Sequence, residues 1–180
     1  MSGTTPAQKP GRDDSPAHDS QFCSEFYAPY EAAAHAALSL LCDVRREMVC
    51  DVLAVQYRLK SASSIREKLQ RKGLPETAQA AAAALRDVAG LRAVLTSRKA
   101  VYRFADLLLA HGAIQLEDVH DYIASPKKSG YRSLHLIVSV PVILGAQTFR
   151  VPAEIQLRTA AMDVWACAEH RLIYKPRIYG

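Results

Sequence analysis

The chain has 180 residues, of which 49% are hydrophobic, enough to bury the core of one domain and hardly of two. Its formal net charge of +5 and its pI of about 9.1 favour an anionic partner, such as a nucleotide, a nucleic acid or a membrane surface, without choosing among them. The four cysteines form no C-x-x-C pair, and neither a signal peptide nor a run of about 18 apolar residues is visible, so we expect a cytoplasmic protein without a zinc site or a membrane span.

The N-terminal part of the chain changes from polar to helix-forming. Residues 1–20 consist mostly of Pro, Gly, Ser and charged residues. This composition predicts a disordered tail, followed by a domain that spans residues 21–180. From residue 22 to residue 55 the sequence is rich in Ala and Leu at helical spacing, which predicts one long helix or two short ones.

The segment after this helical region mixes strand and helix signals. A short strand, "VQYRLK", is expected at residues 55–60, and "SASSIREKLQRKG" is expected to form a helix over residues 61–73. Ser61 or Ser63 can cap this helix, and Gly73 can end it. The next stretch, "TAQAAAAALR", combines strong helix propensity with very small side chains, so it is either a packed helix or a mobile linker.

The second half of the chain alternates strands and helices. We expect a strand that starts at Asp87, a helix over residues 99–112, an antiparallel pair of strands over residues 133–144 and 147–159, and a final helix over residues 160–175. This order predicts an α+β fold, a single mixed β-sheet of about five strands with helices packed on it.

Basic residues gather around the start of the helix expected after "VQYRLK". Lys60, Ser64 and Lys68 recur every four residues near a helix N-terminus, which suits phosphate binding, and Arg58 can add to the set. A solvated basic helix face has the same pattern. Asp87 opens a strand near these cations, which makes it a candidate Mg²⁺ ligand or a simple turn residue.

The last expected strand has one polar face. Strand alternation assigns Glu154, Gln156 and Arg158 to the same side, which looks into a cleft or into water.

A basic turn, "SPKKSGYRS", precedes the antiparallel pair of strands. Lys127, Lys128 and Arg132 can meet phosphates there, and Tyr131 offers a flat face on which a purine can stack. Together, these groups are the parts needed for a phosphoryl-type transfer between two nucleotides.

Four segments of the sequence form a series of motifs: "RLKSASSIREKL", "DVAGLR", "DYIASPKKSGYRSLH" and "AEIQLRTAAMDVWACAEHRLIYK". In this order and at these separations they resemble the synthetase domain of the RelA/SpoT family, above all its single-domain small alarmone synthetases. The resemblance covers residues 22–175 and implies a nucleotidyltransferase-like synthetase fold. It also implies the transfer of pyrophosphate from ATP to the 3′-hydroxyl of GDP or GTP, which yields the stringent-response alarmones ppGpp or pppGpp.

The resemblance implies roles for individual residues. The residues assigned to ATP are Arg58, Lys60, Ser64, Lys68 and Arg92. The residues assigned to the acceptor nucleotide are Tyr131, Lys127, His135, Gln156 and His120. Asp87 would bind Mg²⁺, and Glu154 would either help to bind this metal or act as the catalytic base. Arg58 and Arg92 would sandwich the adenine, and Tyr131 would stack on the guanine.

The chain departs from the family pattern at several places. His120 stands where a basic residue is usual, and Pro152 directly precedes the strand of Glu154, where it suits a sheet edge or a bulge. The sequence also lacks the C-terminal helices with which typical members build a tetramer, which leaves the homo-oligomeric state and allosteric control open. Two alternatives remain: a toxic small alarmone synthetase that pyrophosphorylates tRNA 3′ ends or makes adenosine alarmones, and a catalytically decayed nucleotide-binding fragment.

Overall fold

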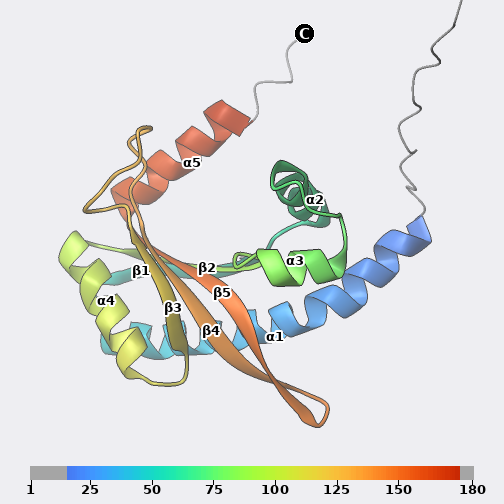
Figure 1. Ribbon diagram of the computed structural model, residues 1–180. Helices are drawn as coiled ribbons and strands as arrows, with labels where there is room; N and C mark the ends of the chain where they lie inside the picture. Colours follow the sequence, from blue (N-terminus) through green and yellow to red (C-terminus); the bar gives the residue numbers. More distant parts are fainter. Residues whose placement is uncertain (1–15, 175–180) are drawn as a thin grey trace, which may run out of the picture.

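The fold is built around one mixed β-sheet whose five strands lie in the order β1-β2-β5-β4-β3 (Figure 1). The computed structural model describes residues 16–174 and, of these, the side chains of residues 26–169. The helices are α1 (Pro16–Glu47), α2 (Ala62–Arg71), α3 (Ala78–Ala84), α4 (Arg98–Ala110) and α5 (Ala160–Tyr174). The strands are β1 (Val52–Leu59), β2 (Ala89–Leu95), β3 (Gln115–Asp121), β4 (Leu134–Leu144) and β5 (Gln147–Thr159). β2 runs parallel to β5 and the other pairs are antiparallel, so the predicted mixed sheet is confirmed.

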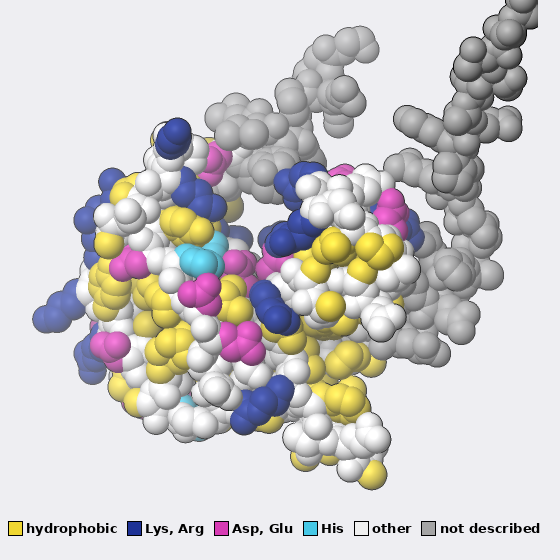
Figure 2. Space-filling model, viewed as in Figure 1, with side chains coloured by type: hydrophobic (Ala, Val, Ile, Leu, Met, Phe, Trp, Pro, Cys, Tyr) yellow, Lys and Arg dark blue, Asp and Glu magenta, His cyan; other side chains and the backbone are white. Residues whose placement is uncertain are grey.

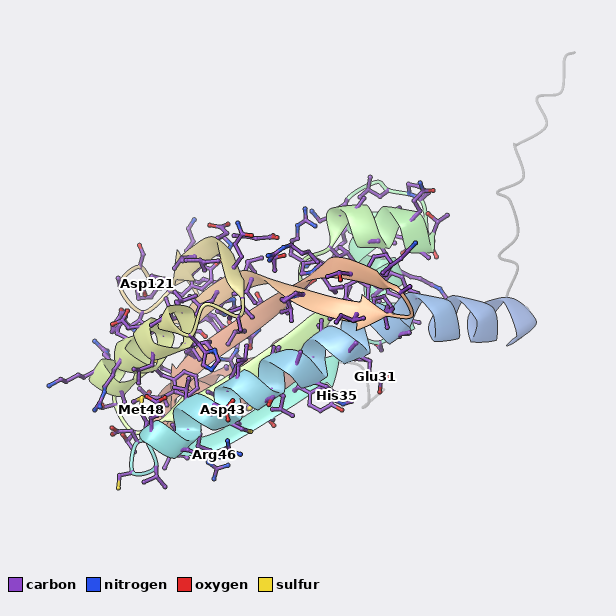
Figure 3. The ribbon with its side chains drawn as sticks, turned by 90° about the horizontal axis from the view of Figure 1, so that it is seen from below. Glu31, His35, Asp43, Arg46, Met48 and Asp121 are labelled. Atoms are coloured by element: carbon purple, nitrogen blue, oxygen red, sulfur yellow. The ribbon has the colours of Figure 1, made fainter. Side chains whose placement is uncertain are left out.

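The long helix α1 covers one face of the sheet (Figure 3). The side chains that it buries recur at steps of three and four residues: Ala34, Ala37, Leu41, Val44 and Met48. This spacing produces one apolar helix face. Since a fully buried leucine or valine contributes about 1.5–3 kcal/mol, this face attaches α1 firmly to the sheet. On the outer side of the helix, Asp43 and Arg46 form an exposed ion pair.

The start of α1 differs from the expected boundary of the domain. α1 begins at Pro16, so residues 16–20 lie in a helix rather than in the predicted tail, and residues 1–15 lie outside the described residues. The helix continues through Pro29, so the alternative of two short helices is wrong.

β4 and β5 form the predicted antiparallel hairpin, and the chain reverses at Gly145. Gly145 has a φ of 62°, in the left-handed region that glycine adopts without steric cost. β5 meets β2 only from Ala153 onward, so Pro152 lies where β5 has β4 as its single neighbour. A proline lacks the N–H group that a second neighbour would need, and the predicted edge position is confirmed.

Some elements lack a clear signal in the sequence. β3 is exposed along almost its entire length, so no apolar alternation predicts it. The stretch after α2 proves to be a helix, α3, capped by Thr77, whose hydroxyl accepts from the N–H of Ala80 at 3.2 Å. The prediction that a strand starts at Asp87 is wrong: β2 starts at Ala89, and Asp87 lies in the connection that leads into it.

Candidate active site

Two rows of residues cross the sheet on the face opposite the α1 core. The strand registers align Gln56, Arg92, Gln156, His135 and His120. The next row consists of Arg58, Gly90, Glu154, Ile137 and Asp118. The intervening β5 residues Ala153, Ile155 and Leu157 are fully buried, so the predicted alternation of β5 is confirmed. The open face of the sheet is therefore polar, and it holds several of the residues that the sequence singles out.

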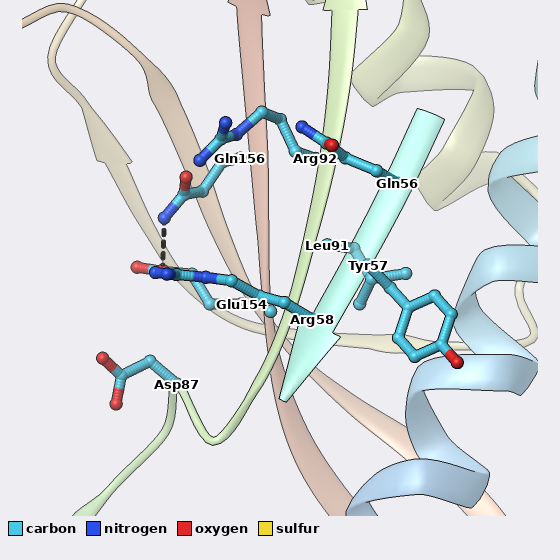
Figure 4. A pocket seen from close by; sticks show the side chains of 9 residues that line it. Gln56, Tyr57, Arg58, Asp87, Leu91, Arg92, Glu154 and Gln156 are labelled. Carbon is cyan, nitrogen blue, oxygen red and sulfur yellow. Dashed lines mark hydrogen bonds between the residues drawn. The ribbon is translucent and has the colours of Figure 1, made fainter. Parts of the chain in front are cut away.

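A pocket lies on this open face where β1, β2 and β5 meet the segment before β2 (Figure 4). Its lining residues are Gln56, Tyr57, Arg58, Asp87, Gly90, Leu91, Arg92, Glu154 and Gln156. Tyr57 points away from the others in Figure 4, and its hydroxyl lies 2.8 Å from a ring nitrogen of His35 on α1. The space-filling view shows acidic and basic side chains around a hollow between the sheet and α2 (Figure 2). The pocket thus combines guanidinium and carboxylate groups.

Asp87 is held by two lysines, Lys60 just before α2 and Lys68 in the last turn of α2. Lys60 Nζ and Lys68 Nζ each donate to Asp87 Oδ2 at 2.7 Å. Ser61 caps α2 by accepting from the N–H of Ser64 at 3.4 Å, which fixes the first turn beside these lysines. Burial alone would raise the pKa of Asp87, but the two ammonium groups outweigh burial and lower the pKa. Its other oxygen, Oδ1, is buried and has no hydrogen-bond partner among the described residues.

Five side chains beside the pocket form a closed ring of hydrogen bonds. Glu154 Oε1 lies 2.9 Å from His135 Nδ1, and Glu154 Oε2 accepts from Gln156 Nε2 at 2.7 Å. His135 Nε2 lies 2.7 Å from the Tyr131 hydroxyl. Arg158 Nη2 closes the ring by donating to the Tyr131 hydroxyl at 2.6 Å and to Gln156 Oε1 at 2.9 Å.

The ring determines the ionisation state of Glu154. Burial alone would raise the pKa of Glu154, but the hydrogen bond and charge interaction with His135 and the hydrogen bond from Gln156 lower it below its ordinary value. Glu154 is therefore ionised at neutral pH. Since an ionised carboxylate only accepts hydrogen bonds, Nδ1 of His135 carries the proton that faces it.

Asp163, in the first turn of α5, connects this ring to the pocket. Its Oδ1 accepts from Arg158 Nη1 at 3.0 Å and forms an ion pair with Arg92 Nη1 at 3.1 Å. Arg158 is only 4% exposed, and a buried guanidinium group needs such partners. Strand alternation draws attention to Arg158, but no sequence pattern points to Asp163, because its contacts depend on how α5 docks against the sheet.

The loop between β3 and β4 carries Tyr131. Gly130, with a φ of 83°, closes a turn in which its N–H donates to the carbonyl of Lys127 at 2.8 Å. The Lys127 ammonium lies 4.4 Å from the ring centre of Tyr122 and 4.9 Å from that of Tyr131, a cation–π arrangement. Arg132, which we expected to face phosphates, donates to a backbone carbonyl of the preceding turn at 3.0 Å. Arg132 therefore connects the loop to the preceding turn.

His120 occupies the outer end of the first row. It pairs with Asp118 at 3.4 Å, and its ring stacks on Tyr122 with centroids 6.0 Å apart. Tyr122 contacts His120, Lys127, Tyr131 and His135 through its ring, yet the sequence analysis does not single it out. Tyr122 lies in the turn directly after β3, and no sequence pattern points to it.

A comparison with known families matches residues 57–178 to the family described as "Region found in RelA / SpoT proteins". The chain belongs to the RelA/SpoT family. The match begins in β1 and includes Asp87, Tyr131 and Glu154. The resemblance drawn from the four motifs is therefore confirmed.

Individual relatives and solved structures agree with this assignment. GTP pyrophosphokinase YwaC of Bacillus subtilis (strain 168) is 43% identical over 118 residues, which cover 66% of this chain and 56% of YwaC. GTP pyrophosphokinase YjbM of the same organism is 35% identical over 166 residues, which cover 87% of this chain and 75% of YjbM. The crystal structure of small alarmone synthetase 1 from Bacillus subtilis, bound to its product pppGpp, matches with a TM-score of 0.78 and 33% identity over 86% of this chain and 80% of that chain. The predicted synthetase fold is confirmed.

Among the described helices, none combines the length and the apolar composition of a membrane span. No group of three or more His, Cys, Asp or Glu side chains among the described residues could hold a metal ion. The cytoplasmic location, the domain limits and the oligomeric state stay predictions.

Proposed function

We propose that the chain is a (p)ppGpp synthetase, which transfers the β,γ-pyrophosphate of ATP to the ribose 3′-hydroxyl of GDP or GTP and releases AMP. The observation that carries this proposal is the position of Glu154. It lines the pocket together with Asp87, and on its other side it is bonded to His135, which holds Tyr131. A carboxylate between a phosphate-binding pocket and an aromatic platform suits a transfer between two nucleotides. The names of the relatives YwaC and YjbM support the same activity.

In this proposal the donor ATP lies in the pocket. Arg58 and Arg92 would hold the adenine between planar guanidinium groups, which stack well on aromatic faces. Lys60 and Ser64 would meet the phosphates at the N-terminal end of α2, where free N–H groups and the helix dipole favour anions, and Lys68 would reach them from the last turn of α2. The side chains of the two lysines are 18% and 29% exposed, so phosphates can reach their ammonium groups.

The acceptor nucleotide would bind at the Tyr131 loop. Tyr131 would stack on the guanine, an interaction worth about 1–3 kcal/mol per base in nucleic-acid complexes. Its hydroxyl is fixed by His135 and Arg158, so the ring is oriented before the base arrives. The other residues proposed to face the phosphates and ribose of the acceptor are Lys127, His135, Gln156 and His120.

Asp87 and Glu154 fit a Mg²⁺ ion that is shared with the substrate. Mg²⁺ prefers one or two carboxylates together with substrate phosphates. Asp87 Oδ1 is buried without a hydrogen-bond partner among the described residues, and both carboxylates line the same pocket. When bound there, Mg²⁺ would neutralise charge on the transferred pyrophosphoryl group and orient it.

Glu154 would accept the proton of the attacking 3′-hydroxyl. A bond forms between the ribose O3′ and the β-phosphorus. The bond from the β-phosphorus to the α,β-bridging oxygen breaks, and AMP leaves with the electron pair. A positioned base typically contributes about 10²–10⁴-fold. The lowered pKa of Glu154 makes it a weak base, but it keeps the carboxylate ionised and ready to accept a proton at neutral pH.

The test is to incubate the full chain with Mg²⁺, ATP labelled in its β and γ phosphates, and separately GDP, GTP, ADP or deacylated tRNA. We expect label on GDP or GTP, and none when EDTA is present. Label only on tRNA or ADP would instead support a toxic small alarmone synthetase. If circular dichroism shows that the chain is folded and no label is transferred, the result would support the alternative of a catalytically decayed nucleotide-binding fragment.

A further inference from the structure

Arg158 is a buried charge whose bonds point to the acceptor side of the site. It is 4% exposed and donates to the Tyr131 hydroxyl at 2.6 Å and to Gln156 Oε1 at 2.9 Å. Its Nε lies 3.4 Å from the hydroxyl of Ser133. Since a guanidinium group donates in a fixed planar fork, these partners fix one another in orientation. The position of the Tyr131 ring therefore depends on the position of Arg158.

Asp163 connects Arg158 to the donor side of the site. A single oxygen, Oδ1, accepts from Arg158 Nη1 at 3.0 Å and forms an ion pair with Arg92 Nη1 at 3.1 Å. Arg92 lines the pocket, and its Nε is buried without a hydrogen-bond partner among the described residues. Without the carboxylate, two positive guanidinium groups would face each other at close range and move apart. Asp163 thus sets the positions of both arginines together.

We propose that Arg158 and Asp163 are positioning residues that couple the two nucleotide sites, so that ATP bound beside Arg92 strengthens guanine-nucleotide binding at Tyr131. The inference rests on the proposed function, because it needs a purine at each site. ATP that restricts the motion of Arg92 also restricts Asp163 and, through Arg158, the remaining motion of the Tyr131 ring. The second nucleotide then meets groups whose motion is already reduced, which gives positive cooperativity. By linkage, GDP must strengthen ATP binding by the same factor.

The experiment is isothermal titration of the full chain with GDP and Mg²⁺, with and without saturating α,β-methylene-ATP, whose modified bridge cannot be cleaved. In the unmodified chain we expect the affinity for GDP to be at least about 5-fold higher when the analogue is present. This factor is the lower end of typical coupling between sites. In Asp163→Asn this factor should fall towards one. Asp106→Asn, a charge removal at an exposed position of α4, is the matched control and should keep the factor of the unmodified chain.

A second variant keeps the inference testable if Asp163→Asn fails to fold. Tyr131→Phe retains the ring for stacking and the Arg158–Asp163 pair, but it removes the hydroxyl through which Arg158 holds the ring. Tyr131→Phe should lower the coupling factor by a larger ratio than it lowers the affinity for GDP measured without the ATP analogue. A purely structural role predicts a lower melting temperature with unchanged coupling, and that result would overturn the inference, as would an unmodified chain without coupling. Failure of the proposed function is seen separately, as absence of transfer from unmodified ATP.

Discussion

Replacing Glu154 with glutamine tests the assigned chemistry with the least change in shape. Glu154→Gln removes the negative charge and the proton acceptor, while the side chain keeps its length. The substitution leaves the other pocket residues proposed to bind ATP and its metal unchanged: Arg58, Arg92 and Asp87. We therefore expect Glu154→Gln to lose pyrophosphate transfer and to keep ATP binding.

Two effects of Glu154→Gln contribute to the expected loss of activity: a lost hydrogen bond and a lost base. The oxygens of the Glu154 carboxylate face two donors, His135 Nδ1 at 2.9 Å and Gln156 Nε2 at 2.7 Å. A glutamine offers one oxygen, so one donor would meet an NH₂ group, and one charge-assisted bond worth about 1.5–3 kcal/mol is lost. Loss of the base lowers the rate by about 10²–10⁴-fold, which corresponds to a barrier higher by about 3–5 kcal/mol. We expect kcat to fall by about 10²-fold or more.

The assay combines single-turnover transfer from labelled ATP with equilibrium binding of ATP to the same preparation. Glu31→Gln, at an exposed position on α1 and on the opposite side of the sheet, is the matched control and should transfer at the rate of the unmodified chain (Figure 3). A rate of Glu154→Gln within about tenfold of the unmodified chain would refute both the base role and the metal role of Glu154. Loss of ATP binding together with transfer would show that Glu154 instead holds the pocket together.

Three further predictions concern the lysine pair, acid stability and the core. Lys68→Met removes one of the two cations on Asp87 Oδ2, so it should raise both the pKa of this aspartate and the KM for ATP in initial-rate assays; an unchanged KM would contradict the phosphate role. Because the pKa values of Asp87 and Glu154 are lowered, their stabilising contribution is complete above the ordinary carboxyl range and is lost as the pH falls through the lowered values. The free energy of unfolding, measured in urea at decreasing pH, should show this loss, and the loss should be smaller in Glu154→Gln. An equal slope of this free energy against pH in the two proteins would contradict the prediction. Phe104→Ala, at a fully buried position of α4, should lower the free energy of unfolding by about 3–5 kcal/mol, and a change below about 1 kcal/mol would show that the packing differs.

Sequence patterns predict those parts of the fold in which burial alternates with a regular period. The apolar steps of α1, the alternation of β5 and the glycine at the β4–β5 turn each follow from local physics, because one face of each element must meet the core. β3 has no such signal, since its residues are exposed and it pairs with β4 at the edge of the sheet. The start of α1 at Pro16 is also beyond such patterns, because the sequence around it is polar.

The candidate site divides in the same way. Lys60, Lys68 and Asp87 are close in sequence or stand at element ends, so their meeting could be anticipated. The contacts of Asp163 could not, because they join the first turn of α5 to β2 and β5, and no single-element pattern encodes such docking. Lys127 illustrates a further limit: its charge suggests a phosphate ligand, but its position over two tyrosine rings depends on the turn at Gly130.

The central claim is that this chain moves a pyrophosphoryl group intact between two nucleotides. The most direct measurement is ³¹P NMR and mass spectrometry of the products formed from ATP, GDP and Mg²⁺ by the full chain. The account predicts equal amounts of AMP and of a guanosine nucleotide that carries two additional phosphates on its 3′-oxygen. Recovery of unchanged GDP, with ATP either intact or hydrolysed, from a chain that circular dichroism shows to be folded would contradict it.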